Sequence, residues 1–342
     1  MSTVTNNFNA DEKILKYVDK LDYFFNSHKT LIVVEFDLTN KCNNRCPKCC
    51  GINENNKELN KEQIDNIIYG LNALECKGAI LSGGGEPLIS PYFEYALKKL
   101  RNCGIKCGVN SNGLALNEKL SYLIAENCEY LRISLDAATP EIYKLTHGMD
   151  EKCFNQTLEN IKNFARIKKE IGSSTSFGVG FLTSKDTERD MEGFVKLTRD
   201  LGVDFAQFRP FTEDMLDITE KYNELKEKYE TDDFKVRASM QKYREMGTLG
   251  ERPYNKCSGM FFSTVITANA KVFACLHHRQ DDKYFLGDIT DKDSLENIFR
   301  SARMREVYES IDCSKCPPLC RNDVFNRTLN TLSLDVGHKE FL

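Results

Sequence analysis

Three cysteines stand close together near the start of the chain, at Cys42, Cys46 and Cys49, in the run C-N-N-R-C-P-K-C. Thiolates are the usual ligands of iron–sulfur clusters, and this C-x3-C-x2-C array can hold three irons of a [4Fe–4S] cube. The fourth iron then has no protein ligand and can bind a small molecule, whereas a purely electron-transferring cluster normally takes four cysteines. A zinc knuckle is the alternative, but zinc wants four ligands and the closest histidine in sequence is His28.

A glycine-rich turn, Gly83-Gly84-Gly85-Glu86-Pro87, follows the short apolar run Ala79-Ile80-Leu81. Glycines let the backbone approach a ligand and expose its N–H and C=O groups. A glycine run alone is more often a tight turn. Together with the cysteine loop, however, it resembles the radical S-adenosylmethionine (SAM) superfamily. In that family the open iron chelates the amino and carboxylate groups of SAM, and one-electron reduction releases a 5′-deoxyadenosyl radical.

The resemblance implies a first set of SAM contacts. The family's G-G-E-P motif matches Gly84, Gly85, Glu86 and Pro87, whose backbone and Glu86 side chain are expected to hold the SAM amino group. Asn110, in the run N-S-N-G, has a family counterpart that borders the same site. A plain turn, with Asn-Gly at positive φ, explains that run equally well.

A second set of implied SAM contacts lies further along the chain. Ser134 and Asp136, in the run I-S-L-D-A, are expected against the SAM ribose and carboxylate, with helix capping as the alternative role of Asp136. Gln207 and Arg209 are two apart on an expected strand, so they point the same way. Arg209 is predicted to bind the SAM carboxylate or a substrate anion, and a salt bridge at the barrel rim is the structural alternative.

Two residues of the cysteine loop depart from the family pattern. Lys48 stands where relatives commonly carry an aromatic residue or histidine that touches adenine, so this adenine contact is in doubt. Cys50 adds a further thiol, which is not expected to bind the cluster because Cys42, Cys46 and Cys49 already fit.

A second group of cysteines lies near the C-terminus, at Cys257, Cys275, Cys313, Cys316 and Cys320. A hairpin pattern separates the first two, and the run C-S-K-C-P-P-L-C holds the other three. A hairpin and a helix can bring such residues together as a four-thiolate site, for which zinc and a second [4Fe–4S] cluster compete. A chain already equipped for one iron–sulfur cluster favours the second cluster.

This region resembles the SPASM and twitch extensions of radical SAM enzymes. A full SPASM domain uses more cysteines, to hold two auxiliary clusters, so five cysteines imply one auxiliary [4Fe–4S] cluster. The expected ligands are Cys257, Cys275, Cys313 and Cys316, with Cys320 as the alternate for the fourth position.

Strand and helix patterns alternate about six times over the first two thirds of the chain. Expected strands at 31–38, 79–81, 105–109, 130–135, 176–182 and 205–208 alternate with amphipathic helices, which favours parallel strands with right-handed crossovers. Six units are too few for a closed eight-stranded barrel. The fold class is therefore α/β: a partial, open (β/α)6 barrel with a small C-terminal α+β domain, as the family resemblance also implies.

The same patterns divide the chain into four parts. An amphipathic N-terminal helix within residues 1–29 precedes the barrel at 30–212. A polar, helical linker is expected at 213–256 and the auxiliary cluster domain at 257–342. In barrels of this kind the chemistry lies at the carboxyl ends of the strands, where the Cys42–Cys49 loop begins.

Composition excludes several classes of protein. A net charge of −4 gives no basic footprint for nucleic acid, and no run of apolar residues is long enough to span a membrane. The N-terminus lacks the features of a signal peptide. Fourteen cysteines without an export signal indicate reduced thiols in the cytoplasm, with metal ligands more expected than disulfides.

The sequence therefore predicts a radical SAM enzyme of the oxidoreductase or epimerase type. Its expected substrate is a small polyhydroxylated molecule (a sugar, cyclitol or nucleotide sugar), since only 41 residues precede Cys42 and peptide-modifying relatives often carry a leader-binding domain there. A peptide maturase is the alternative, and a non-catalytic iron–sulfur electron carrier or zinc-binding protein is the alternative of another class. The expected cofactors are SAM and two [4Fe–4S] clusters, with flavodoxin or ferredoxin as the reductant.

Overall fold

A single curved sheet organises the protein. The computed structural model describes residues 11–25, 31–49, 51, 56–211, 214, 216–240, 243, 252–317 and 320–334. Its ten strands follow the order β10-β9-β8-β1-β2-β3-β4-β5-β6-β7. The strands are β1 (Val33–Asp37), β2 (Gly78–Ser82), β3 (Lys106–Ser111), β4 (Tyr130–Ser134), β5 (Ser176–Thr183), β6 (Phe205–Pro210), β7 (Lys235–Ala238), β8 (Ser263–Ile266), β9 (Lys271–Phe273) and β10 (Phe285–Asp288).

The strands from β8 through β1 to β7 all run parallel, while β9 pairs antiparallel with both β8 and β10. The outermost strands of the sheet, β7 and β10, are not paired with each other, so the barrel is open. The predicted partial α/β barrel is confirmed.

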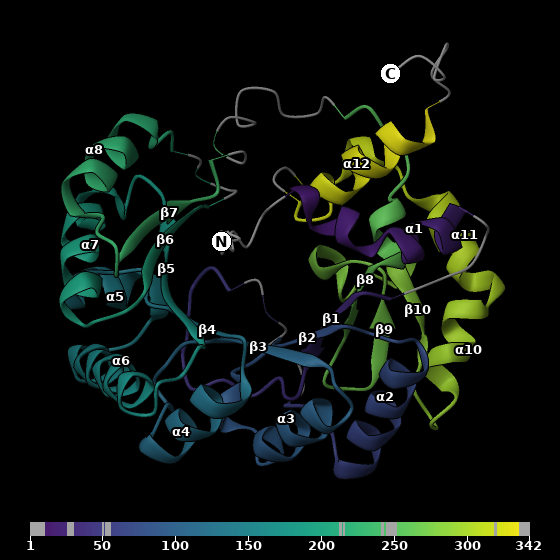
Figure 1. Cartoon of the computed structure of the whole chain (residues 1–342), viewed down its shortest axis with the longest axis horizontal. Coiled ribbons are helices and arrows are strands. Elements are labelled where there is room, and N and C mark those ends of the chain that lie inside the picture. The colour runs from purple at the N-terminus through teal and green to yellow at the C-terminus, as the bar shows by residue number, and fades with distance from the viewer. Residues whose placement is uncertain are drawn as a thin grey trace.

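Helices cover the outer, convex side of this sheet, while the concave side faces the middle of the molecule (Figure 1). Those of the barrel are α2 (Lys61–Ala73), α3 (Phe93–Asn102), α4 (Glu118–Asn127), α5 (Pro140–His147), α6 (Glu151–Glu170), α7 (Met191–Asp200) and α8 (Thr219–Tyr229). The C-terminal helices are α10 (Ser294–Arg300), α11 (Ala302–Ser310) and α12 (Asp323–Ser333). The N-terminal segment forms a 3-10 helix, Asp11–Tyr17, and α1 (Val18–Phe25).

The helices form where the sequence pattern predicts them. In α2 the buried side chains include Ile64, Ile67, Ile68 and Leu71, and Asn60 closes the first turn in a capping box with Gln63. Thr139 caps α5 ahead of Pro140, and Gly148 ends that helix in the left-handed conformation at φ 66°. These local signals fix the crossovers that return the chain to each parallel strand.

The sequence places the start of α3 too early. Ser90 and Pro91 are predicted as its N-cap and first residue, but the helix begins at Phe93. The Ser90 hydroxyl accepts a hydrogen bond from the Tyr92 N–H at 3.3 Å, within the turn that precedes the helix. The local side-chain bond therefore stabilises a turn in place of the first helical turn.

The predicted helical linker at 213–256 contains a strand that the sequence analysis missed. Helix α8 occupies part of it, but Lys235–Ala238 forms β7 and pairs parallel with β6. Only one residue of β7, Val236, is a large apolar side chain buried at 1% exposure, so the strand lacks the apolar run that marked the others. The linker thus adds the last strand of the barrel sheet.

The C-terminal region extends the same sheet, which the sequence does not reveal. Strand β8 pairs parallel with β1, from Val33 opposite Ser263 to Phe36 opposite Ile266. Helix α10 packs on α2, where Gly70 is needed because an added Cβ would lie 2.6 Å from Leu295 Cβ. The barrel and the C-terminal region therefore share both a sheet and a helix contact. Within the described residues, no helix is long and apolar enough to cross a membrane.

Candidate active site

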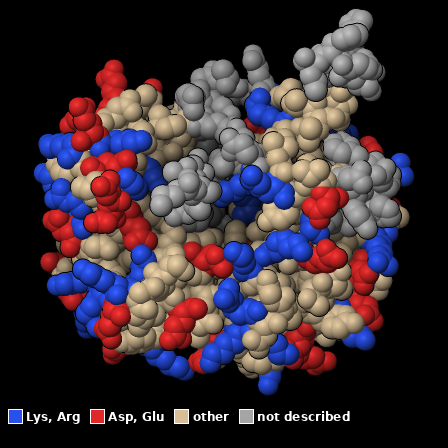
Figure 2. Space-filling view, viewed as in Figure 1, with Lys and Arg blue, Asp and Glu red and all other residues tan. Residues whose placement is uncertain are grey.

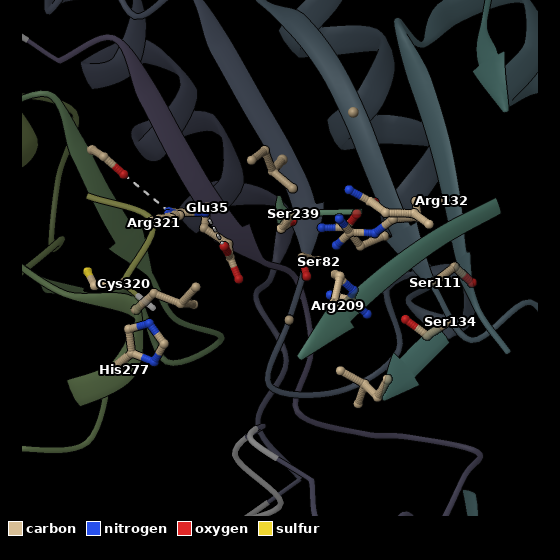
Figure 3. Close-up of a pocket in the computed structure, with 18 of the residues that line it drawn as sticks. Glu35, Ser82, Ser111, Arg132, Ser134, Arg209, Ser239, His277, Cys320 and Arg321 are labelled. Atoms are coloured by element: carbon tan, nitrogen blue, oxygen red, sulfur yellow. Dashed lines mark hydrogen bonds and ion pairs between the residues drawn. The ribbon is translucent and has the colours of Figure 1, made fainter. Parts of the chain in front are cut away.

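The concave side of the sheet holds a cavity of about 1810 Å³. Its lining comes from the inward-facing residues of the barrel strands, the first cysteine loop and the C-terminal region (Figure 3). Sites for one small molecule usually occupy about 300–1,000 Å³. This cavity is therefore large enough for a cofactor and a substrate together.

The three cysteines of the first loop all line this cavity. Cys42 Sγ accepts a hydrogen bond from the Asn44 N–H at 3.4 Å, and Cys49 Sγ accepts one from the Gly51 N–H at 3.3 Å. Burial, and next the neighbouring Cys49 and Cys42 sulfurs, raise the pKa of Cys46 to about 12. Ionised sulfurs this close together repel one another, and a bound metal cluster would neutralise their charge. The three thiols therefore fit such a cluster.

The glycine loop lies directly against the cysteine loop. The Gly85 and Glu86 N–H groups donate to the carbonyls of Thr39 and Lys41, at 3.0 and 2.8 Å. A Cβ added at Gly85 would lie 2.0 Å from the Lys41 carbonyl oxygen, and one added at Gly51 would lie 2.3 Å from that of Gly84. The two backbones can approach this closely only because these positions are glycine.

Glu86 joins the ends of two strands. Its buried carboxylate accepts hydrogen bonds from the Ser111 hydroxyl at 2.8 Å and from the N–H groups of Asn112 and Leu88 at 2.7 and 3.0 Å. Burial raises the pKa of Glu86, and these donors oppose that rise. The sequence analysis foresaw Glu86 at the site but not that it holds the glycine loop against the end of β3.

The other predicted SAM contacts also reach the cavity. Asn110, Ser134, Asp136 and Arg209 all line it, and Asn110 Oδ1 is buried without a hydrogen-bond partner in the described part of the chain. Asp136 has a positive φ of 50° and accepts a hydrogen bond from the Leu182 N–H at 2.6 Å. Asp136 is not the cap of α5, because Thr139 fills that role. Cys50 lies outside the described residues.

His147 is a site residue that the sequence analysis missed. It is buried at the end of α5, with its Nε2 2.9 Å from the Leu135 carbonyl oxygen and its Nδ1 3.3 Å from Cys46 Sγ. A carbonyl can only accept, so Nε2 carries a hydrogen and Nδ1 of the neutral ring is left as an acceptor facing the sulfur. Burial lowers the pKa of His147, and Asp136, with Oδ2 3.7 Å from Nε2, opposes this.

All five C-terminal cysteines come together beside the cavity. Cys313 lies between Cys257 and Cys316, and its hydrogen bonds lower the pKa of both while its own pKa is raised. Asn326 Nδ2 lies 3.4 Å from Cys257 Sγ. The pKa of Cys275 is raised to about 12, by burial first and then by the nearby Cys320.

Of the five C-terminal cysteines, Cys320 lines the cavity itself (Figure 3). Within the described residues, no group of three or more His, Cys, Asp or Glu side chains is spaced to hold a metal ion. By their chemistry, five soft thiol donors suit a [4Fe–4S] cluster, and four of them would also suit zinc.

A buried ion network connects the C-terminal region to β1. Arg279 binds Glu35 and Asp37, with nitrogen–oxygen distances of 3.1 and 2.8 Å, and no side chain of these three is more than 7% exposed. Arg321, next to Cys320, binds the other oxygen of Glu35 at 2.9 Å. Burial raises the pKa of Asp37 to about 7, against the opposing effect of Arg279.

Comparison with known proteins agrees with this arrangement. Residues 36–198 match the model of the radical SAM superfamily, and residues 257–322 match that of the SPASM iron–sulfur cluster-binding domain. The chain is a radical SAM protein with a C-terminal SPASM domain. The cofactors of these domains are SAM and [4Fe–4S] clusters, as the sequence predicted.

Curated relatives of this radical SAM protein are distant. A GTP 3′,8-cyclase of Synechocystis sp. is 30% identical over 40% of the chain and 43% of the relative. Molybdenum cofactor biosynthesis protein 1 of Dictyostelium discoideum is 26% identical over 66% of the chain and 38% of its own length. The chain thus covers less than half of each of these two relatives.

Solved structures share the fold of this radical SAM protein at low sequence identity. Streptococcus suis SuiB bound to the precursor peptide SuiA aligns with a TM-score of 0.65, at 12% identity, over 91% of this chain and 74% of that one. The structure of anSMEcpe with bound AdoMet aligns with a TM-score of 0.61, at 18% identity, over 84% and 88% of the two chains. These identities support the fold alone.

Proposed function

We propose that this protein is an enzyme that cleaves SAM reductively and abstracts a hydrogen atom from a small polyhydroxylated substrate, which it then oxidises or epimerises. The observation that carries the proposal is a glycine loop packed on a three-cysteine loop, both of which line a cavity of about 1810 Å³. A [4Fe–4S] cluster with one open iron supplies the electron for SAM cleavage when it is bound. Cys42, Cys46 and Cys49 would hold that cluster.

The chain's own residues position SAM in this proposal. The backbone of Gly84, Gly85 and Pro87 would bind its amino group, with Gly85 lining the cavity, while Glu86 fixes the loop against β3 through Ser111 and Asn112. Asn110 lines the same cavity, and its buried side-chain oxygen has no partner among the described residues. Ser134 and Asp136 would contact the ribose and carboxylate, because both lie at the end of β4 and line the cavity.

Cys257, Cys275, Cys313 and Cys316 would hold one auxiliary [4Fe–4S] cluster, with Cys320 as the alternate fourth ligand. We keep the predicted domains, with the barrel at 30–212 and the cluster domain at 257–342, but count β7 of the segment 213–256 with the barrel. We place the protein in the cytoplasm with flavodoxin or ferredoxin as its reductant, because its thiols and clusters need reducing conditions.

The substrate class rests on the lining of the cavity and on the relatives. Hydroxyl groups of Ser82, Ser134 and Ser239 reach the cavity and can bind sugar hydroxyls (Figure 3). Relatives named GTP 3′,8-cyclase take a substrate of the same broad kind, a nucleotide that contains a sugar. A peptide is the second candidate, because SuiB, which shares the fold, was solved with its precursor peptide. A simple electron carrier would not need the large cavity.

Iron content gives a direct test of the two clusters. We expect about eight irons per chain after anaerobic reconstitution, four for each [4Fe–4S] cluster. The variant with Cys42, Cys46 and Cys49 all changed to alanine should retain about half of that iron. Metal analysis of both proteins checks this, and zinc in place of the remaining iron would show that the C-terminal site is structural.

The role of the auxiliary cluster can be tested separately. If it accepts an electron from the substrate radical, Cys257→Ala should leave SAM cleavage largely intact yet stop product formation, because the two clusters serve successive steps. Cys320→Ala is the matched control and should matter less than Cys313→Ala if the expected ligand set is right. Normal product formation by Cys257→Ala without its second cluster would leave the C-terminal domain only a structural role. Production of 5′-deoxyadenosine and of the oxidised substrate are measured in parallel.

A further inference from the structure

Two arginines lie close together on the inner side of the barrel, and their side chains have no partner among the residues that the structure describes. Arg132 projects from β4 and Arg209 from β6, and Figure 3 shows their guanidinium groups near each other in the cavity. Between them runs β5, whose inward positions at this level are Gly178 and Gly180. A Cβ added at Gly180 would lie 3.4 Å from Arg209 Nη2 and 3.7 Å from its Nε. The Arg209 guanidinium therefore lies across the bare backbone of β5, toward Arg132.

Neither guanidinium is neutralised by the protein. Among the described residues, neither makes a hydrogen bond or an ion pair through its side chain, and Nε of each is buried without a partner. Burial first, and then the charge of Arg209, lower the pKa of Arg132 to about 10. Like charges that lie close together in a half-buried position without partners are costly, so such a pair is expected where a ligand completes it.

The nearest carboxylates already have other partners. Asp136 accepts the Leu182 N–H at 2.6 Å and faces His147. Glu35 is bound through both oxygens, to Arg279 and Arg321. Other arginines at this cavity are thus satisfied by acidic side chains, while Arg132 and Arg209 are not. Basic side chains also border the central hollow on the face shown in Figure 2, which suits the entry of an anion.

We infer that Arg132 and Arg209 together bind an oxyanion of the substrate, a phosphate or a carboxylate. Two planar guanidiniums can hold the oxygens of such a group in charge-assisted, bidentate hydrogen bonds. The inference rests on the proposed function and narrows its substrate to an anionic polyhydroxylated molecule, such as a sugar phosphate or a nucleotide. Of the two ligands that the sequence analysis left open for Arg209, the SAM carboxylate and a substrate anion, it favours the substrate anion.

The position of the pair favours substrate over SAM. The SAM amino group is expected beside the cysteine and glycine loops, which follow β1 and β2, and its carboxylate beside Asp136, just after β4. The arginine pair lies over β4, β5 and β6, and Arg132 stands two residues before the end of β4. A phosphate or carboxylate held there would leave the rest of the substrate pointing toward the centre of the cavity.

Equilibrium binding of inorganic pyrophosphate and of malonate to the reconstituted protein tests this inference without turnover. We expect Arg132→Gln and Arg209→Gln each to weaken binding of the preferred anion about 10-fold or more, since a hydrogen bond to a charged group contributes about 1.5–3 kcal/mol. SAM affinity should stay unchanged in both. Arg300→Gln is the matched control, because Arg300 has a 74% exposed side chain and a local partner, Glu296. Tighter pyrophosphate binding would identify a phosphorylated substrate, and tighter malonate binding a carboxylate.

Thermal unfolding separates binding from folding. Removing one of two unneutralised like charges should raise the melting temperature of Arg132→Gln above that of the parent, or leave it unchanged. Unchanged anion affinity in both variants, or a loss of SAM affinity in its place, would overturn the inference. Absence of SAM cleavage by the parent protein would instead overturn the proposed function, and the anion titration would still report on the pair.

Discussion

Alanine at Cys42, Cys46 or Cys49 is expected to abolish formation of 5′-deoxyadenosine from SAM. Each change removes one of the three sulfurs that line the cavity beside the glycine loop, and the chain offers no equivalent donor there among the described residues. Removing a residue that hydrogen-bonds to a metal ligand typically lowers metal affinity or activity about 10–100-fold. Removing a ligand itself should therefore lower 5′-deoxyadenosine formation more than about 100-fold. The measurement is 5′-deoxyadenosine formed under reducing, anaerobic conditions.

The control for this experiment is Cys103→Ala. Cys103 is exposed at the end of α3 and does not line the cavity, so its loss should leave SAM cleavage unchanged. Substantial 5′-deoxyadenosine from any of the three loop variants, with the C-terminal site fully loaded with iron, would refute the assignment of the loop.

Replacing Arg279 by methionine is expected to destabilise the protein by about 3–5 kcal/mol at pH 8, the usual cost of removing one partner of a buried ion pair. The change leaves Asp37, which is 0% exposed, without its cation, while Glu35 keeps Arg321. Because the network links the SPASM domain to β1, the loss should appear as a lower denaturation midpoint of the whole chain. Chemical unfolding followed by circular dichroism measures it.

The destabilisation by Arg279→Met should depend on pH. Burial raises the pKa of Asp37 to about 7, and Arg279 opposes this rise. A raised carboxyl pKa means that the native state binds the proton more tightly, so stability falls as pH rises from about 4 to about 7. Without Arg279 the pKa of Asp37 rises further, so the decrease in stability continues to higher pH. The difference between variant and parent should therefore be larger at pH 8 than at pH 5.

Two further variants check the cause. Adding Asp37→Asn to Arg279→Met removes the uncompensated charge and should recover part of the lost stability at pH 8. Arg300→Met, on the exposed surface, should change stability little, because exposed ion pairs contribute at most about 1 kcal/mol. An equal loss of stability in Arg279→Met and Arg300→Met would contradict the role given to the buried ion network. A failure of Asp37→Asn to recover stability in the Arg279→Met protein would contradict it as well.

Local patterns predicted the barrel well and long-range pairing poorly. The helices of the barrel follow from apolar periodicity and caps, as at Asn60 and Thr139, because these signals lie within a few residues of one another. Strand β7 escaped prediction because it is short and lacks an apolar run. The pairing of β8 with β1 escaped because no local signal encodes which distant strand completes an edge.

For the candidate site too, the residues in short motifs could be predicted and the residues without a sequence pattern could not. Its cysteines and glycines were found because their spacing is a short motif. His147 was missed because a single histidine has no pattern, and its contact with Cys46 depends on how α5 returns to the cysteine loop. The arginine pair could not be foreseen either, since Arg132 and Arg209 meet only because Gly180 leaves the strand between them bare.

The pairing of β1 with β8 has a consequence for synthesis of the protein. Strand β1 leaves the ribosome early, but its partner at Ser263–Ile266 is made only after the rest of the barrel. Until then β1 is an edge strand whose backbone groups on one side lack partners, and such an edge can pair with another chain. The open edge must therefore be protected or short-lived while the ribosome completes the chain. For the same reason, a shortened protein that ends before β8 would keep that edge and tend to aggregate, even with every barrel helix in place.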